Sequence, residues 1–142
     1  MIEIKKFQFD NKDMMKKAHN IRYDVFVIGQ NCPEEIEWEF EEESTHFLVY
    51  DNKEAVATAR HRKTDKGYKL ERFAVSKSNR GKGYGHIVLK AILKDLKDVT
   101  EMIYMHAQIQ VLPFYEKLGF LKEDGLFEEA GIMHYKMVLH TS

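Results

Sequence analysis

Short runs in which apolar and polar side chains alternate dominate the first half of the chain, and this period of two predicts β-strands. Four such runs are expected to form strands, at residues 2–9, 46–50, 55–62 and 68–75. Asp51–Lys53 and Asp65–Gly67 lie between the last three runs, and each has the composition of a hairpin turn. The pattern therefore predicts three consecutive antiparallel strands in the middle of the chain.

Apolar residues spaced three and four positions apart predict two longer helices. The first carries Met14, Ala18, Ile21 and Val25 at helical spacing, with Asp10 or Asn11 available as its N-terminal cap. The second follows residue 85 and has one apolar side and one polar side. Its apolar side is Val88, Leu89, Ile92, Leu93 and Leu96, and its polar side is His86, Lys90, Lys94 and Lys97.

The remaining elements complete an α+β layout. A glutamate-rich helical segment is expected after Pro33, a strand near residues 102–107, and a short helix that ends at Gly119, followed by two final strands. The order predicts a mixed and mainly antiparallel central sheet of about six to seven strands flanked by about four helices. With no linker or internal repeat, residues 1–142 are expected to form a single domain.

The segment Arg80–Gly85 reads Arg-Gly-Lys-Gly-Tyr-Gly and separates a predicted strand from a predicted helix. A glycine-rich loop at a helix start offers backbone N–H groups and a positive helix end to a phosphate. Arg80 and Lys82 add positive charge to the same loop. This composition indicates a site for a cofactor that carries a pyrophosphate, although a flexible loop is the alternative interpretation.

Spacing excludes two common phosphate motifs. A dinucleotide fingerprint would need a third glycine at position 86, where the chain has His86, and no segment matches the P-loop pattern. The remaining pattern, Arg-x-x-Gly-x-Gly, resembles the acetyl-CoA loop of the GNAT N-acetyltransferase superfamily. A second segment is similar to the same family: Gln108 lies seven residues before Tyr115, within a strand followed by Phe-Tyr-x-x-x-Gly-Phe at 114–120.

Two further segments resemble a small ElaA-like branch of that superfamily. They are residues 25–30, followed by Pro33, and residues 127–137 near the C-terminus. Position 29 is more often Glu in that branch, whereas this chain has Gly29, so the acceptor side is expected to differ. The resemblance covers the chain from about Arg22 to Met137 and implies the GNAT fold.

The resemblance also implies which residues bind the cosubstrate acetyl-CoA. The main chain around Phe73, Ala74 and Val75 would polarise the acyl carbonyl and bind the pantetheine arm. The loop and the later helix would supply the other contacts. The expected cofactor-binding residues are Phe73, Ala74, Val75, Arg80, Gly81, Lys82, Gly83, Tyr84, Gly85, Gln108, Phe114 and Lys117.

Tyr115 is the expected general acid, because a phenol keeps its proton at neutral pH and can donate it to a leaving thiolate. The alternative is that its ring only packs beside neighbouring aromatic residues. The base is open between several interpretations. Alternation along the strand places Lys69, Glu71, Phe73 and Val75 on one face, so Glu71 is a candidate that could equally form a salt bridge. His134 and Glu129 are alternatives that would act near neutral pH, and an amine of low pKa, or a water chain, would need no dedicated base.

The acceptor side is indicated by less specific features. Gln30 and Glu129 lie in the two ElaA-like segments and are expected to contact the substrate. Seven glutamates within residues 33–43 either form an acidic lip that attracts a cationic amine or a solvated face that Ile36, Trp38 and Phe40 anchor to the core. The sequence does not decide between these interpretations.

Composition narrows the class of protein. The chain has 22 Lys plus Arg and 23 Asp plus Glu, and this net charge of −1 gives no electrostatic reason to expect nucleic acid as a partner. Cys32 is the only cysteine, which excludes an internal disulfide, and the seven histidines lack metal-ligand spacing. No run is long and apolar enough for a membrane span or a signal peptide, so a cytoplasmic protein is expected.

These observations predict an acyltransferase that moves an acetyl group from acetyl-CoA to a primary amine of a small molecule by direct transfer. Two alternatives stay open: a non-catalytic acyl-CoA-binding or regulatory module, and an N-acetyltransferase that acts on a peptide or protein. The fold that the resemblance implies also admits a homodimer that shares its final strands.

Overall fold

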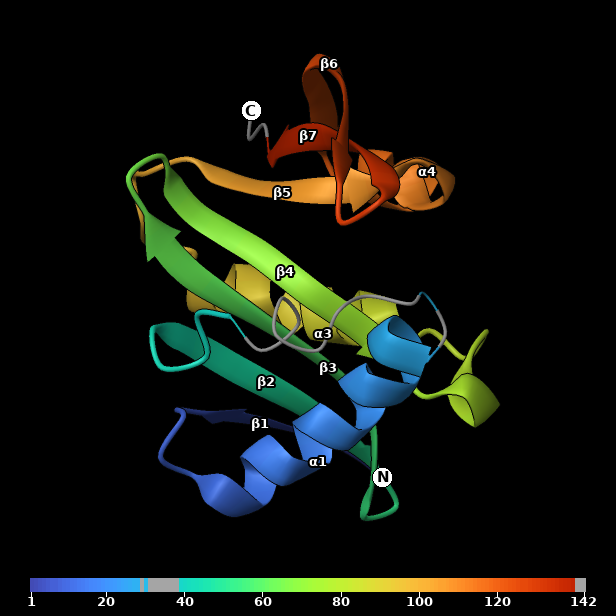
Figure 1. The fold of residues 1–142 in the computed structure, drawn as a ribbon. Helices are drawn as coiled ribbons and strands as arrows, with labels where there is room; N and C mark the ends of the chain where they lie inside the picture. Colours follow the sequence, from blue (N-terminus) through green and yellow to red (C-terminus); the bar gives the residue numbers. More distant parts are fainter. Residues whose placement is uncertain (29, 31–38, 140–142) are drawn as a thin grey trace. The chain divides into compact units, whose positions relative to one another are not determined.

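The structure is a computed structural model that describes residues 1–28, 30 and 39–139. Its strands form a seven-stranded mixed sheet in the order β1-β2-β3-β4-β5-β7-β6 (Figure 1). The chain divides into two compact units, residues 1–62 with 72–99 and residues 63–71 with 100–142. No helix within the described ranges is long and apolar enough to cross a membrane.

The first unit contains the N-terminal strands and two helices. Its elements are β1 (Ile2–Phe7), α1 (Lys12–Arg22), the π-helical segment η1 (Tyr23–Ile28), β2 (Ser44–Asp51), most of β3 (Glu54–Thr64), the end of β4 (Gly67–Val75), the 3₁₀ turn η2 (Lys77–Asn79) and α3 (Tyr84–Asp95). The pairs β1–β2 and β2–β3 are antiparallel, and the second of these pairings is one that the alternating pattern predicts. Both predicted hairpin turns are confirmed by the ends of these strands.

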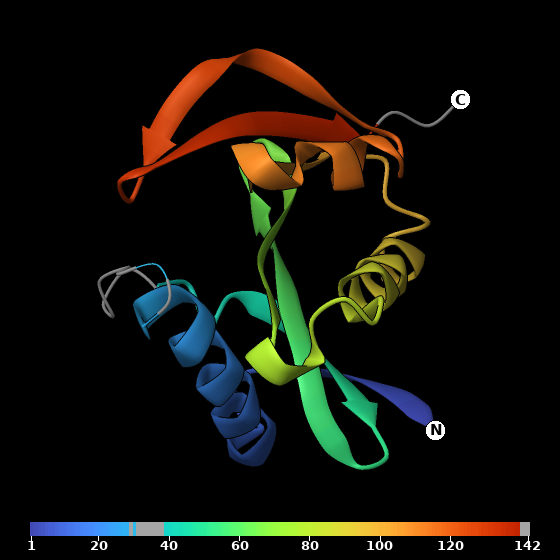
Figure 2. The ribbon, with the colours of Figure 1, turned by 90° about the vertical axis from the view of Figure 1, so that its right-hand side faces the viewer.

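Helices α1 and α3 lie on opposite faces of the strands in this first unit (Figure 2). The α1 side of the core contains Phe7, Met15, Ala18, Ile21 and Leu48, all buried. Asn11 caps α1, since its Oδ1 accepts a hydrogen bond from the N–H of Met14 at 3.2 Å. The amphipathic prediction for α3 is confirmed by buried Val88, Leu89, Ile92 and Leu96 and by exposed Lys90 and Lys94.

The second unit contains the start of β4 and the C-terminal elements. These are β5 (Ile103–Gln108), the 3₁₀ turn η3 (Ile109–Val111), α4 (Leu112–Glu116), β6 (Phe120–Glu129) and β7 (Ile132–Leu139). The register pairs β4 with β5 in parallel and β5 with β7 and β7 with β6 in antiparallel. One face of these strands is apolar: Leu70, Met105, Ala107, Met137 and Phe120 are buried there.

Two expectations from the sequence differ from the structure. The described part of the chain has three α-helices where about four are predicted. Of the helical segment expected after Pro33, residues 39–43 form turns, and the preceding positions fall on residues 31–38, outside the described residues. Cys32, Ile36 and Trp38 lie there too. The prediction of regular alternation along β4 is wrong, because Arg72 has a φ of 60° and interrupts the extended backbone. The face of Lys69 and Glu71 therefore cannot be extended to Phe73 and Val75.

Candidate active site

The glycine-rich loop of the first unit is anchored at its start by a buried asparagine. Asn79 donates from Nδ2 to Ser76 Oγ at 2.6 Å, and the N–H of Ser76 donates to the carbonyl of Val56 at 2.9 Å. Lys82 Nζ lies 3.5 Å from Asn79 Oδ1. The short turn η2 is therefore fixed to β3, and the loop after it starts from a defined position. The sequence analysis missed Asn79, and its only signal is a small polar residue just before the loop.

Two glycines give the loop its path into α3. Gly81 and Gly83 have φ values of 82° and 84°, in the left-handed region that glycine adopts without strain. A Cβ at either position would meet no atom within 4 Å, so open space lies beside the backbone. Gly83 is the N-terminal cap of α3 and has no side chain to bond the first N–H groups of the helix. This arrangement suits an anion at the helix start.

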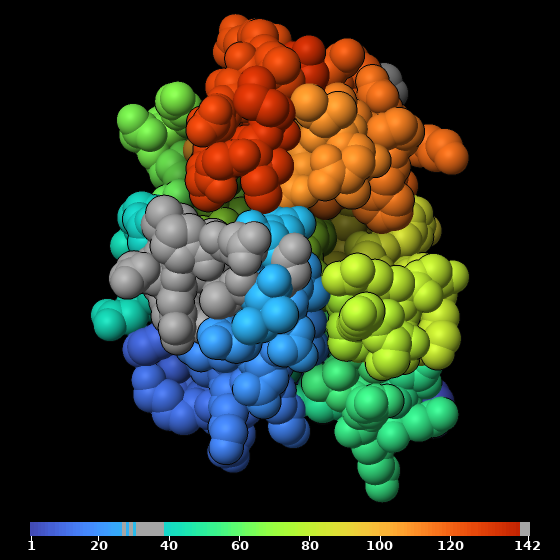
Figure 3. Space-filling model, turned by 45° about the vertical axis from the view of Figure 1, so that its right-hand side comes forward, coloured from blue at the N-terminus to red at the C-terminus, as the bar shows by residue number. Residues whose placement is uncertain are grey.

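The charged residues of the loop lie at the surface. Lys77, Arg80 and Lys82 are exposed, and the loop is visible on the surface of the first unit in yellow-green (Figure 3). Tyr84 behaves differently, since its ring is buried and its hydroxyl donates a hydrogen bond to Asp51. Its side chain therefore ties α3 to the β2–β3 turn, and only its main chain is suited to the expected cofactor contact. Gly85 lies in the first turn of α3.

The end of β4 holds the residues expected to contact the acyl group. Ala74 is buried, whereas Phe73 and Val75 are half-buried. The left-handed residue Arg72 precedes them and interrupts the extended backbone of the strand. Such irregular backbone is the type of structure that can direct an N–H group at a ligand carbonyl.

Tyr115 lies in α4, within the second unit, and is 7% exposed. Its ring makes edge-to-face contacts with Phe114 at 5.1 Å and with Phe120 at 6.1 Å between centroids. Burial raises the pKa of its hydroxyl above the ordinary value of 10, so the phenol keeps its proton at neutral pH. The packing interpretation is thus correct for the ring, and the protonation state is the one that a general acid needs.

The other expected residues around Tyr115 are more exposed. Gln108 ends β5 and accepts a hydrogen bond on Oε1 from Gln110 at 2.6 Å. Phe114 is 37% exposed, and Lys117, the C-terminal cap of α4, is also exposed. Turns continue from the end of α4 to Gly119, whose φ of 97° is left-handed, so the chain leaves the helix close to the predicted position.

The candidate bases Glu71, Glu129 and His134 all lie in the second unit. Glu71 has the Lys69 ammonium 3.4 Å from its carboxylate, so the salt-bridge interpretation of this residue is confirmed. His134 is buried and its Nδ1 lies 2.7 Å from the carbonyl of Ile132. Because a carbonyl only accepts, Nδ1 carries the proton and Nε2 is the basic nitrogen. Glu129 accepts a hydrogen bond from His106 Nδ1 at 2.9 Å, a pairing that the sequence does not reveal.

The glutamate-rich segment contributes one buried carboxylate, that of Glu41, to the interior of the first unit. The prediction that Phe40 anchors this segment is wrong: its ring is 41% exposed and lies against the Arg62 guanidinium, 3.9 Å from the centroid. Glu41 is the buried residue, and its carboxylate accepts hydrogen bonds from Arg22, from Arg60 at 2.7 Å and from His19 at 3.2 Å. Both guanidinium groups satisfy the buried carboxylate.

The environment of Glu41 shifts two pKa values. Burial opposes ionisation of Glu41, but the hydrogen bonds from His19 and Arg22 and the charges of Arg22 and Arg60 outweigh it and lower its pKa to about 2. Burial lowers the pKa of His46 to about 4, and its neutral ring donates from Nε2 to the Glu41 carbonyl at 3.0 Å. These residues are a structural ion-pair network inside the first unit.

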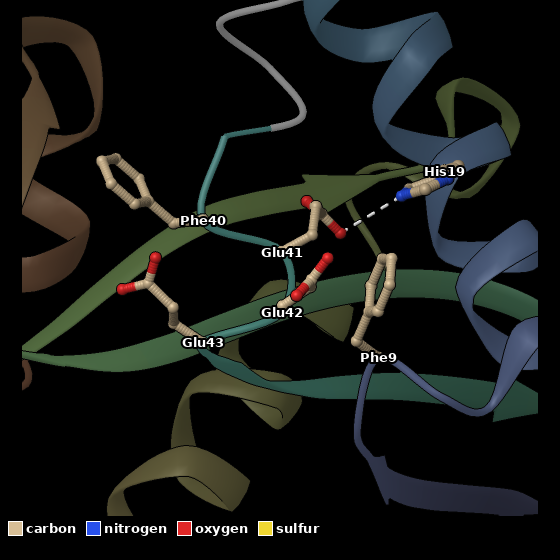
Figure 4. A pocket seen from close by; sticks show the side chains of 6 residues that line it. All are labelled: Phe9, His19, Phe40, Glu41, Glu42 and Glu43. Carbon is tan, nitrogen blue, oxygen red and sulfur yellow. Dashed lines mark hydrogen bonds and ion pairs between the residues drawn. The ribbon is translucent and has the colours of Figure 1, made fainter.

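A pocket of about 480 Å³ lies beside this network (Figure 4). Its lining consists of Phe9, His19, Phe40, Glu41, Glu42 and Glu43. The lining contains none of the expected cofactor-binding or catalytic residues. Gln30, expected on the acceptor side, is half-buried, and Gly29 lies outside the described residues.

Comparison with known proteins identifies the family. A family model described as an acetyltransferase (GNAT) domain matches residues 12–141. The chain belongs to the GNAT family. This GNAT domain is 41% identical over 132 residues to a Bacillus subtilis (strain 168) protein named Uncharacterized N-acetyltransferase YjcF, a match that covers 90% of this chain and 94% of the relative.

Solved structures agree with this assignment. Escherichia coli ElaA superposes with a TM-score of 0.87 at 27% identity and covers 99% of this GNAT domain and 100% of its own chain. The PaiA N-acetyltransferase of Thermoplasma acidophilum, solved in complex with coenzyme A, has a TM-score of 0.70 at 14% identity and covers 99% of each chain. The GNAT fold and the ElaA-like branch predicted from the sequence are confirmed.

Proposed function

We propose that the protein is an acetyl-CoA-dependent N-acetyltransferase that moves an acetyl group directly to a primary amine of a small molecule. The observation that carries this proposal is the left-handed Gly81–Gly83 path into the uncapped start of α3, beside exposed Arg80 and Lys82. This geometry suits the pyrophosphate of coenzyme A. Membership of the GNAT family supports an acyl-CoA as cosubstrate, and acetyl is the acyl group that we propose.

The reaction needs one bond to form and one to break. The neutral amine nitrogen attacks the thioester carbonyl, a C–N bond forms, the C–S bond breaks, and the amine loses a proton while the thiolate gains one. Main-chain N–H groups near Phe73–Val75 are proposed to stabilise the carbonyl oxygen. Tyr115 is proposed to protonate the thiolate, because burial keeps its hydroxyl protonated.

Of the proposed bases, His134 is better supported than Glu71. The Glu71 carboxylate is paired with Lys69, and taking up a proton would break that pair. The Nε2 atom of His134 is the basic nitrogen of a ring whose Nδ1–H is already bonded to Ile132. We therefore assign the proton uptake to His134.

Ligand-induced stabilisation tests the cosubstrate separately from the reaction. Acetyl-CoA at a hundredfold excess over its Kd should stabilise the protein by about 2.7 kcal/mol, and the melting temperature should rise accordingly. Acetyl-pantetheine, which lacks the pyrophosphate, is the matched control and should give a much smaller rise. An unchanged melting temperature at millimolar acetyl-CoA would remove the cosubstrate assignment.

A panel of small amines then tests the reaction. Release of the CoA thiol should depend on both the protein and the amine, and each active amine should yield its N-acetyl product by mass spectrometry. Binding of acetyl-CoA without turnover of any small amine would favour a non-catalytic module or a peptide acceptor instead.

A further inference from the structure

One face of the strands in the second unit carries a continuous set of polar and titratable side chains. Cross-strand partners point to the same face of a sheet, and so do residues two apart on one strand. The register aligns Gln108 with His134 and His134 with Phe127, and it aligns His106 with Lys136. The residues that share this polar face are Lys69, Glu71, Tyr104, His106, Gln108, Phe127, Glu129, His134 and Lys136.

Burial makes this polar face unusual. Lys69 and His134 are each only 8% exposed. The opposite face holds Met105 and Met137, which are buried. Apolar side chains could occupy the same buried positions, since a desolvated ion pair contributes little net stability. Stability alone therefore does not explain the polar residues. Clusters of buried titratable groups are frequent where a protein performs chemistry.

The centre of the polar face is the pair of His106 and Glu129. The Nδ1–H of His106 donates to Glu129 Oε2 at 2.9 Å, which fixes the carboxylate. Phe127 packs against both histidine rings: it lies edge-on to His106, with 5.0 Å between ring centroids, and it stacks on His134 at 5.8 Å. The Glu129 side chain stays 40% exposed, so a ligand can still reach the carboxylate.

The charges around Glu129 favour a cation as that ligand. The hydrogen bond from His106 and the Lys69 charge outweigh burial and hold the pKa of Glu129 below its ordinary value, so the carboxylate is ionised. The Lys69 ammonium is itself paired with the Glu71 carboxylate at 3.4 Å, so it does not cancel the Glu129 charge. Lys136, opposite His106, is paired with Glu123 at 3.3 Å.

We propose that this polar face binds the acceptor as a primary ammonium ion on Glu129, with His106 as a positioning residue, and that His134 Nε2 takes the proton which activates it. The ammonium N–H bond breaks, its electron pair stays on nitrogen as the nucleophile, and an imidazolium forms on His134. This inference rests on the proposed function and narrows its substrate class to amines that are cationic at neutral pH.

The first test compares two adjacent glutamates. Glu129→Gln keeps the shape and removes the charge, whereas Glu128→Gln does the same on the exposed, opposite face. Glu129→Gln should raise KM for a cationic amine about tenfold or more, the effect of one lost charge-assisted contact, with kcat changed far less. Glu128→Gln should match wild type, and both variants should bind acetyl-CoA normally. Unchanged KM in an active Glu129→Gln enzyme would overturn the inference while the proposed function stands.

The role of His106 is tested by rescue. His106→Leu should raise KM in the same direction as Glu129→Gln, because it removes the donor that fixes the carboxylate. His106→Asn restores a donor near the position of Nδ1 and should recover most of the affinity. Equal KM values for the Leu and Asn variants would contradict a positioning role.

A binding measurement separates this inference from the reaction. Butylammonium at millimolar concentration, without acetyl-CoA, should shift the imidazole NMR signals of His106 and His134 in wild type but not in Glu129→Gln. The neutral isostere butan-1-ol should shift neither. If no amine is turned over but butylammonium gives this response, the proposed reaction fails and the cation site stands; no response would overturn the site.

Discussion

Tyr115 is the proposed proton donor, and burial sets the protonation state of its hydroxyl. Its ring packs between Phe114 and Phe120, and this environment disfavours the phenolate. The raised pKa keeps Tyr115 protonated at neutral pH, so the hydroxyl carries the proton that a leaving thiolate would take. A protonated hydroxyl supports the proposed donor role, whereas aromatic packing alone would be satisfied by phenylalanine.

Replacing Tyr115 with Phe tests this role. The variant keeps the ring contacts and removes the proton, so kcat should fall roughly 10²-fold, within the usual range for a lost general acid, while acetyl-CoA affinity stays within about twofold. Pre-steady-state kinetics should be used to establish that chemistry limits turnover. Tyr135→Phe, on β7 of the same unit, is the control and should retain activity. A wild-type rate in Tyr115→Phe would exclude it as the acid.

At the scale of elements, the loop and α3 together form the proposed anion-binding site. Asn79 fixes the loop start, Gly81 and Gly83 turn the backbone, and the first N–H groups of α3 follow directly. Tyr84 fixes the helix start through Asp51. In this proposed site, anion binding depends mainly on the direction of the backbone N–H groups, and side-chain charge adds to it.

Two isosteric substitutions at Gly83 separate charge from shape. Asn and Asp both tolerate a left-handed backbone better than most residues, and they differ in charge. Gly83→Asp should reduce acetyl-CoA affinity at least about tenfold more than Gly83→Asn, because it places a carboxylate against the proposed pyrophosphate. Calorimetric titration measures this difference, and the unliganded melting temperatures serve as the control. Equal affinities would mean that the phosphates bind elsewhere.

At the scale of the whole molecule, buried charges govern how stability depends on pH. The folded state lowers the pKa of His46 to about 4 from 6.5. The unfolded chain therefore binds a proton first on acidification, so stability falls as the pH drops through this window. Glu41, with a pKa of about 2 against 4.5, extends the loss to lower pH. Burial also lowers the pKa of His61, which acts in the same direction.

Urea unfolding should record this dependence. Between about pH 7 and about pH 4 the free energy of unfolding should fall by at least about 2 kcal/mol from His46 alone. His46→Gln removes this titration, so its unfolding free energy should change less over the same interval, whatever its value at neutral pH. An equal change in both proteins would show that His46 does not remain neutral in the folded state.

Most of the fold was accessible to sequence reasoning because its periodicities are local. Alternation located β1 to β4, helical spacing located α1 and α3, and turn residues located both hairpins. The errors arose where tertiary contacts override the pattern. Arg72 adopts a left-handed conformation that its residue type does not predict, and Phe40 is exposed where an apolar anchor was expected.

The sequence likewise identifies some residues of the candidate site and leaves others to the folded structure. The loop and the aromatic motif are contiguous in sequence, so their residue types and spacing identify them directly. The pairs Glu129–His106 and Asp51–Tyr84 join residues 23 and 33 positions apart, and nothing local links them. The tautomer of His134 depends on the Ile132 carbonyl, a contact that only the folded chain defines.

The sequence by itself determined the order of elements and the glycine-rich loop, because both follow from short-range spacing, and the resemblance of its motifs implied the GNAT family. Tertiary structure alone decided the protonation states and partners of the titratable groups. Burial keeps Tyr115 protonated, hydrogen bonds from His19 and Arg22 and the charges of two arginines keep Glu41 ionised, and the sheet register brings His106, Glu129 and His134 onto one face. Desolvation and charge proximity depend on distances in space, which residue order does not specify.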